Sequence, residues 1–219
     1  MSVAHVDDLF DASQPGARTA LGAQACVLHA FALPRVEALL AGIAAVETAA
    51  PFRRLVTRGG HVMQVAMTNC GRYGWYSDRH GYRYDPQDPL AGRPWPAMPD
   101  AFRQLAAEAA AAAGFERYEP DACLINRYAP GTRLSLHQDR DEDDRIAPIV
   151  SVSLGLPATF LFGGFARADS SVRVPLRHGD VVVWGGADRM RFHGVLPVKP
   201  GCHPVTGEAR INLTFRKVR

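Results

Sequence analysis

The stretch PIVSVSLGLPATFLF, residues 148–162, contains two short runs of β-branched and aromatic residues, which Gly155 and Pro157 separate. Three similar runs follow at residues 172–176, 180–184 and 211–215. Many short strands broken by glycine and proline are typical of a β-sandwich or barrel, such as a jelly roll. We therefore expect a mainly β core over residues 120–219.

Two helices are expected to flank this core, which makes the fold class α+β. Apolar residues recur at helical spacing between Pro34 and Pro51, as in a surface helix with one buried stripe. A second helix is expected from Asp100 through an alanine-rich run to Gly114. Residues 51–98 are rich in Gly, Pro, Arg and aromatic residues and are expected to form irregular hairpins over the core.

The size and composition indicate an ordinary globular protein. The 219 residues fit a single domain, residues 1–219, and 47% of them are hydrophobic. No stretch approaches the apolar length that a membrane span needs, so we expect no membrane partner. The first residues carry Asp7, Asp8 and Asp11 instead of a basic segment and an apolar run, which predicts no secretory signal and a cytoplasmic location.

The net charge and the cysteines exclude few classes of function and do not by themselves indicate a metal site. A formal net charge of +3 permits a nucleic-acid partner without requiring one. Four scattered cysteines, without a Cys-x-x-Cys spacing, argue against a zinc knuckle and a secreted disulfide scaffold. We expect them to be reduced and mostly buried.

A candidate metal site is suggested by His137-Gln138-Asp139 and by His193. On an extended strand, residues two apart point to the same face, so His137 and Asp139 would lie together. Two imidazoles and one carboxylate on one side of a metal leave coordination positions free, as in non-haem Fe(II) oxygenases. A His-x-Asp pair alone is weak evidence, because structural or surface pairs account for most of its occurrences.

A candidate site for a dicarboxylate is suggested by the run RINLTFR, residues 210–216. Its polar residues, Arg210, Asn212, Thr214 and Arg216, alternate with apolar ones and so share one strand face. An edge strand with a solvated arginine face fits the pattern equally well. Inside a barrel, however, two guanidiniums would grip a diacid, and Asn126 and Tyr128 could add neutral donors. A metal beside a dicarboxylate suggests 2-oxoglutarate.

These motifs together resemble the AlkB dealkylating dioxygenases. Asn126-x-Tyr128, His137-x-Asp139, His193 and the 210–216 run occur in that family's order, and residues 120–142 and 148–157 look like the bacterial members almost throughout. The resemblance covers roughly residues 50–216. It implies a double-stranded β-helix (jelly-roll) core at 120–219, which carries the catalytic site, and an N-terminal nucleotide-recognition lid at 51–98. It also implies Fe(II), 2-oxoglutarate and O2 as cofactor and co-substrates. We expect the protein to be a monomer.

The resemblance also assigns roles to particular residues. The catalytic iron ligands would be His137, Asp139 and His193. The 2-oxoglutarate contacts would be Asn126, Tyr128, Arg210, Asn212 and Arg216. The sequence leaves open which arginine binds which carboxylate.

The substrate side is suggested by residues 67–76, followed by Tyr82 and Tyr84, where aromatic residues alternate with Arg and Gly. Such a segment supplies faces for stacking bases and cations for phosphates, although the rings could equally pack a loop-rich subdomain. By resemblance, Trp75 would stack on the base and Tyr82 would contact a phosphate or the backbone of the strand. We expect His137 to lie on the other face of the base. Further substrate positions would be Met67, Asp141, Arg167 and Trp184.

Asp141 suggests a preference for positively charged bases. A carboxylate near the base would favour cationic 1-methyladenine and 3-methylcytosine over neutral bases. The alternative is that residues 140–144 are only a solvated charged loop.

The implied reaction is DNA repair by oxidative dealkylation, with release of aldehyde, succinate and CO2. The partner would be alkylated single-stranded DNA or a flipped base, because a duplex hides the ring nitrogen, and RNA stays an open alternative. Two rivals remain at this point. One is the same oxygenase chemistry on a protein side chain, lipid or small molecule. The other is a nucleic-acid-binding jelly roll whose His and Asp residues are structural or hold zinc.

Overall fold

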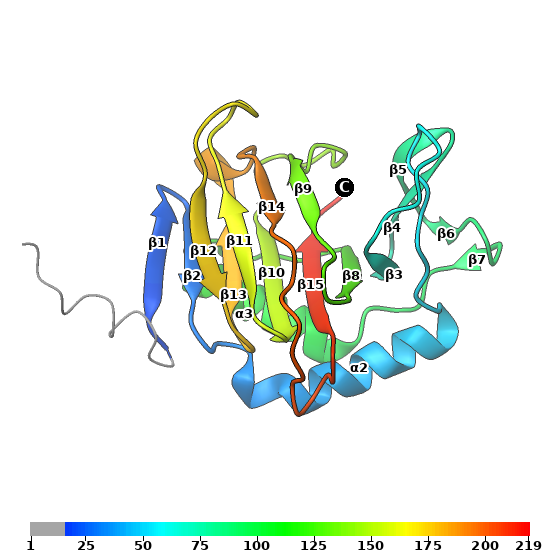
Figure 1. Ribbon diagram of the computed structural model, residues 1–219, viewed down its shortest axis with the longest axis horizontal. Helices are drawn as coiled ribbons and strands as arrows, with labels where there is room; N and C mark the ends of the chain where they lie inside the picture. Colours follow the sequence, from blue (N-terminus) through cyan, green and yellow to red (C-terminus); the bar gives the residue numbers. More distant parts are fainter. Residues whose placement is uncertain (1–15) are drawn as a thin grey trace, which may run out of the picture.

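The computed structural model describes residues 16–219, which form two face-to-face β-sheets with two α-helices outside the larger sheet (Figure 1). Asp7, Asp8 and Asp11, on which the expectation of no secretory signal rests, lie outside the described residues. Within residues 16–219, no helix has the length and apolar character to cross a membrane.

The large sheet has seven strands. They are β1 (Arg18–Gly22), β2 (Ala25–Leu28), β3 (Ala66–Gly71), β8 (Ala122–Tyr128), β10 (Ile149–Gly155), β13 (Val181–Trp184) and β15 (Arg210–Arg216). Their spatial order is β1-β2-β13-β10-β15-β8-β3, and every neighbouring pair is antiparallel. Strand β15 therefore lies inside the sheet, between β10 and β8.

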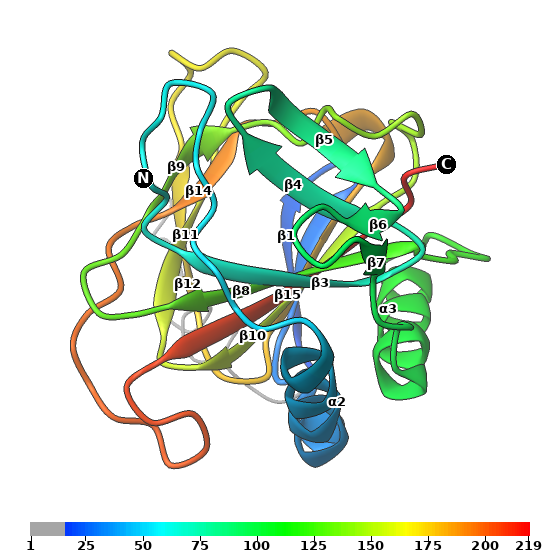
Figure 2. The same cartoon turned by 90° about the vertical axis from the view of Figure 1, so that its right-hand side faces the viewer.

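The small sheet has four antiparallel strands, and two short hairpins lie apart from it. The small-sheet strands are β9 (Leu134–His137), β11 (Ala158–Phe162), β12 (Val172–Leu176) and β14 (His193–Val195), in the order β12-β11-β14-β9. The hairpins pair β4 (Gly74–Asp78) with β5 (Gly81–Asp85) and β6 (Gln87–Asp88) with β7 (Arg93–Pro94). Figure 2 shows the β4–β5 hairpin at the β3 edge of the molecule.

The alternation of side chains in β15 separates two hydrophobic layers. Ile211, Leu213 and Phe215 pack into a cluster that includes the two helices, while Arg210 and Arg216 point to the opposite face, between the sheets. A second apolar cluster fills the space between the sheets and includes Phe160 and Val195 of the small sheet. The molecule is thus the jelly roll that the short strands predict, and the polar face of β15 lies in its interior.

The helices cover the outer face of the large sheet. The longer of them, α2 (Val36–Ala49), buries one stripe that includes Leu39, Ile43 and Val46, as the helical spacing predicts. The other, α3 (Asp100–Ala112), places Phe102 edge-on against Phe215 with ring centroids 6.0 Å apart. A short 3-10 helix, η1 (Leu33–Arg35), precedes α2, and another, η2 (Gly186–Asp188), precedes β14.

The five runs predicted as strands are confirmed as β10, β11, β12, β13 and β15. Two expectations are wrong in detail. Residues 66–71 form β3 of the large sheet and not one of the irregular hairpins expected in that region. Strand β9 ends at His137, so Asp139 lies in the loop after it and not on a continued strand.

Candidate active site

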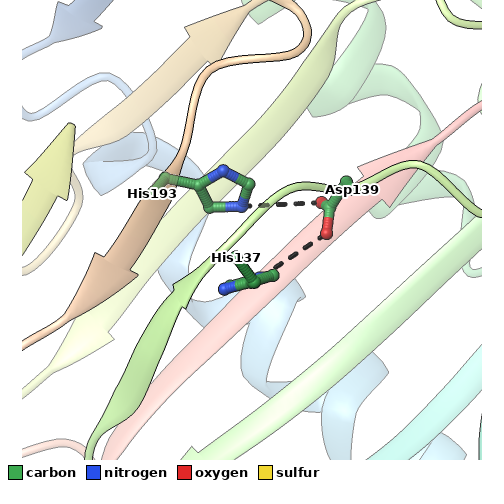
Figure 3. Close-up of side chains that lie close together, drawn as sticks. All are labelled: His137, Asp139 and His193. Carbon is green, nitrogen blue, oxygen red and sulfur yellow. Dashed lines mark ion pairs between the residues drawn. The ribbon is translucent and has the colours of Figure 1, made fainter. Parts of the chain in front are cut away.

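Three side chains that are distant in sequence meet where β9 and β14 approach each other. His137 ends β9, Asp139 follows in the loop, and His193 begins β14 (Figure 3). One possible ligand atom from each residue lies within 4.8 Å of the other two. The Nε2 atoms of His137 and His193 are 3.5 Å and 3.7 Å from the carboxylate oxygens of Asp139. This arrangement could hold one metal ion.

Backbone carbonyls fix both imidazole rings. The Nδ1 atom of His137 lies 2.8 Å from the Ser135 carbonyl, and that of His193 lies 3.1 Å from the Arg191 carbonyl. A carbonyl only accepts, so each Nδ1 carries a hydrogen, and the neutral form of each ring keeps its lone pair on Nε2. Both Nε2 atoms face Asp139, and this is the orientation in which histidine binds a metal.

Gly194 allows the two histidine strands to come together. A β-carbon at this position would lie 2.8 Å from the carbonyl oxygen of Leu134 on β9, which is too close for any other residue. The register between β14 and β9 is irregular at this point, and it places His193 directly opposite His137. Glycine is therefore required by the close approach of backbone to backbone beside the site.

The charges of the site are set by burial and by Arg216. Burial alone would raise the pKa of Asp139, but nearby Arg216 and the two histidines outweigh this and hold it well below its usual value. Burial, together with His137, lowers the pKa of His193 to about 3. At neutral pH the site thus offers one carboxylate and a neutral imidazole from His193 for a cation.

Arg210 is a buried cation whose hydrogen-bonding capacity is only partly used. Its side chain is 1% exposed, and it lies over the Tyr128 ring at 4.8 Å and donates one hydrogen bond to Ser153 at 3.0 Å. Within the described residues, its Nε and Nη1 atoms have no partner. Buried charged donors are normally paired, so this arrangement is suited to an anion that is bound from the cavity.

The neighbouring polar groups line the same wall. Asn212 donates to Ser151 and to the carbonyl of Val152, both at 2.9 Å, and accepts from Thr214 at 2.8 Å. Asn126 of β8 is directly opposite Asn212 of β15, and its side-chain oxygen has no partner within the described residues. The polar face of β15 and β8 therefore forms a ready-made site for a polar acid.

One cavity of 690 Å³ gathers all the site residues predicted from the sequence. Its lining includes His137, Asp139 and His193, then Asn126, Tyr128, Arg210, Asn212 and Arg216, and then Met67, Trp75, Tyr82, Asp141, Arg167 and Trp184. The last six differ in position. Trp184 is 1% exposed, with its ring 4.9 Å from that of His193, while Tyr82 is 51% exposed at the mouth. Arg167 lies over the Phe192 ring at 5.1 Å.

The comparisons with known proteins agree with this geometry. Residues 24–216 match the model of the 2OG-Fe(II) oxygenase superfamily. The chain is 55% identical over 210 residues to the alpha-ketoglutarate-dependent dioxygenase AlkB of Escherichia coli, and the match covers 96% of this chain and 97% of that protein. This chain belongs to the AlkB family. It is accordingly an Fe(II)- and 2-oxoglutarate-dependent dioxygenase that uses O2.

A more distant relative and a solved structure are also similar to this chain. The mouse protein named nucleic acid dioxygenase ALKBH1 is 32% identical over 133 residues, which cover 61% of this chain and 33% of that protein. A solved structure titled "The structure of OsALKBH1" superimposes with a TM-score of 0.79 and 28% identity, and covers 92% of this chain and 100% of that chain.

The AlkB-family cofactors fit the residues that are present. A ferrous ion suits two imidazole nitrogens and one carboxylate with open positions, and a keto diacid suits a metal with a buried, half-paired arginine nearby. Among residues 16–219, Arg210 and Asn126 both keep polar atoms without partners beside the cavity. The donor set and the unpaired groups are therefore those that Fe(II) and 2-oxoglutarate require.

Sequence reasoning missed several residues of this AlkB-type site. Ser151 lines the cavity, and Ser153 binds Arg210; both alternate with apolar residues in β10, so their shared face was a usable signal. Arg189 and Glu142 form a buried ion pair at 3.0 Å beneath Asp139. No local pattern marks that pair, because its partners lie 47 residues apart.

Proposed function

We propose that this chain removes alkyl groups by oxidation from damaged nucleic-acid bases, such as 1-methyladenine and 3-methylcytosine, in DNA repair. The observation that carries the proposal is the cavity of 690 Å³. Its lining includes the His137–Asp139–His193 cluster, Arg210, and the aromatic side chains Trp75 and Tyr82 of the β4–β5 hairpin. The mouse relative whose name specifies nucleic acid supports the same class of substrate.

The iron would be held by His137, Asp139 and His193, and 2-oxoglutarate by the wall that β15 and β8 form. Arg210 would receive the carboxylate remote from the metal, because its Nε and Nη1 atoms are deeply buried and have no partner in the part of the chain that the structure describes. Arg216 would act at the metal end, since it is already bonded to Asp139. Asn126, Tyr128 and Asn212 would complete the contacts with 2-oxoglutarate.

The β4–β5 hairpin would bind the damaged base and so act as the nucleotide-recognition lid expected at residues 51–98. Trp75 and Tyr82 stack with ring centroids 5.6 Å apart and planes 14° from parallel, which presents a flat aromatic face. The indole Nε1 of Trp75 donates to Asp141 at 3.1 Å, so a negative charge lies at the edge of that face. A cationic methylated base would gain from both features.

The protein's part in the reaction is to position the three reactants and to exclude other groups. When bound, iron and 2-oxoglutarate supply the oxidation: O2 is consumed, 2-oxoglutarate leaves as CO2 and succinate, and the hydroxylated alkyl carbon leaves as aldehyde. Trp75 and His137 would hold the ring of the base between them. Met67, Arg167 and Trp184 would shape the cavity around it.

The preferred substrate would be single-stranded, or a duplex from which the damaged nucleotide is flipped out. The alkylated nitrogen has to enter the cavity, and base pairing would prevent this. DNA is the proposed substrate, and RNA is the alternative that the same hairpin could accept. A cytoplasmic location and a monomeric state remain predictions from the sequence.

Turnover tests this function directly. Purified protein is supplied with Fe(II), 2-oxoglutarate, O2 and a single-stranded oligonucleotide that contains 1-methyladenine, and formaldehyde and succinate are measured. We expect both products in equal amounts, and neither above background with His137→Ala or Arg210→Ala. The unmethylated oligonucleotide is the matched control. Succinate formed only with another class of compound would refute the nucleic-acid assignment, and absence of both products would refute the oxygenase assignment.

A further inference from the structure

The β4–β5 hairpin is fastened to the loop that carries Asp139 by two neighbouring hydrogen bonds. Trp75 of β4 and Tyr84 of β5 are directly opposite each other in the hairpin. Trp75 donates to Asp141 at 3.1 Å, and the Tyr84 hydroxyl donates to Glu142 at 2.5 Å. One cross-strand pair of the hairpin thus holds two consecutive acids, two and three residues after Asp139.

Glu142 is a buried junction between the hairpin and two arginines. Its side chain is 2% exposed, and its Oε1 atom, which accepts from Tyr84, is also 3.3 Å from the Nε atom of Arg216. Its other oxygen accepts from Arg189 at 3.0 Å. Both oxygens of this carboxylate are therefore engaged by groups that come from three different parts of the chain.

Both arginines that contact Glu142 also donate hydrogen bonds to Asp139. Arg216 donates to the Asp139 side chain at 2.6 Å and 2.8 Å. Arg189, which is 1% exposed, donates to the Asp139 backbone carbonyl at 2.7 Å. The side chain and the backbone of Asp139 are thus held separately, and the two carboxylates balance the two guanidiniums.

We propose that Tyr84 and Glu142 are positioning residues, which couple the seating of the β4–β5 hairpin to the orientation of Asp139 toward the metal. The inference rests on the proposed function, since it takes Asp139 as an iron ligand and the hairpin as the base-binding element. A base that stacks on Trp75 would press on the same hairpin that Tyr84 anchors. Substrate binding and the geometry of the metal site would therefore be linked through one carboxylate.

The Tyr84 bond can be removed without loss of packing. The Tyr84 ring packs against a small cluster made of Tyr73, Ala122 and Val218, which phenylalanine would still fill. The Arg189–Glu142 and Arg216–Asp139 contacts do not involve the hydroxyl and would survive. Tyr84→Phe thus cuts the link that runs from the hairpin through Glu142, and leaves the Trp75–Asp141 bond and the ion pairs intact.

The test measures the metal site itself and not turnover. Fe(II) is titrated without oxygen into wild-type protein, Tyr84→Phe and Tyr76→Phe, each saturated with 2-oxoglutarate, and the visible charge-transfer band of the complex is followed. Tyr76 lies in the same hairpin, with its ring against Arg83 and outside this network, so it is the matched control. We expect Tyr84→Phe to weaken Fe(II) binding by roughly three- to ten-fold and to shift the band, because changes around metal ligands typically cost ten- to a hundred-fold and this one is a step further out.

Glu142→Gln provides a second variant that keeps an oxygen to accept from Tyr84 but removes the charge. We expect a larger loss of Fe(II) affinity than with Tyr84→Phe, with Tyr76→Phe unchanged. Tyr84→Phe or a folded Glu142→Gln protein with the affinity and band of the wild type would overturn the proposal, even if turnover fell. Failure of the wild-type protein to bind Fe(II) would instead defeat the proposed function.

Discussion

Arg216 donates two hydrogen bonds, from Nε at 2.8 Å and from Nη2 at 2.6 Å, to the same oxygen of Asp139. Both side chains are less than 10% exposed, so the interaction is weakly screened by solvent. The structure thus places a charge-assisted pair directly behind one member of the candidate metal site.

Arg216→Lys should weaken Fe(II) binding by roughly ten- to a hundred-fold, because lysine cannot reproduce the two parallel donors that orient the carboxylate. Oxygen-free titration of Fe(II) measures the effect. Arg127→Lys is the control, since Arg127 pairs with Glu47 away from the cavity. Equal losses in the two variants would show that Arg216 has no special role.

Arg210→Gln should weaken 2-oxoglutarate binding by about a hundred-fold, since loss of a buried charged partner costs about 2–5 kcal/mol. Pyruvate has the keto acid end but no second carboxylate, so its weak binding should change by less than about three-fold. Competition between the two acids for the Fe(II) protein measures both constants. Equal losses for pyruvate and 2-oxoglutarate would place Arg210 at the metal end.

The metal-free protein should lose stability in mild acid through His193. Its pKa is lowered from 6.5 to about 3 in the fold, mainly by burial, so the unfolded chain binds one more proton between these values. The free energy of unfolding should therefore fall as the pH drops through this window, by about 2 kcal/mol between pH 7 and pH 5. Urea unfolding in a chelator measures it. His193→Gln should lack this part of the pH dependence, and identical slopes in both proteins would contradict the assignment.

Asp141→Asn should lower kcat/KM for 1-methyladenine by about ten-fold relative to a neutral alkylated base such as 1-methylguanine, because only the cation gains from the carboxylate. Asparagine keeps an oxygen that can accept from Trp75, so the hairpin contact is retained. Asp143→Asn is the control, since Asp143 is exposed and pairs with Arg219. An equal loss on both substrates would show that Asp141 only shapes the cavity.

The sequence predicted the strands whose patterns are local. The alternation of residues 210–216 left open an exposed edge strand or an interior one, and pairing of β15 with both β10 and β8 decides for the interior. The end of β9 could not be predicted from His137 and Asp139. Two residues in the order His-x-Asp can face the same site on a strand, or with the second residue in an irregular loop. Asp139 therefore reaches the site although β9 ends at His137.

Long-range contacts explain what the sequence did not predict. The sequence of residues 66–71 looks like part of a loop-rich region. These residues form a strand of the large sheet because they pair with β8, which the local sequence does not reveal. Likewise, Arg189 and Glu142 look like ordinary surface charges in sequence, yet both are almost fully buried beneath Asp139. Buried ion pairs of this kind depend on which segments the fold brings together, and no periodicity reveals them.

A crystal structure of the protein with Fe(II) and 2-oxoglutarate, prepared without oxygen, tests the central claim most directly. We predict one metal ion bound at about 2.0–2.2 Å by the Nε2 atoms of His137 and His193 and by an oxygen of Asp139. We also predict that the remote carboxylate of 2-oxoglutarate accepts hydrogen bonds from the Nε and Nη1 atoms of Arg210, which have no partner within the described residues. A metal that lacks His193 as a ligand, or a co-substrate that does not contact Arg210, would contradict the account.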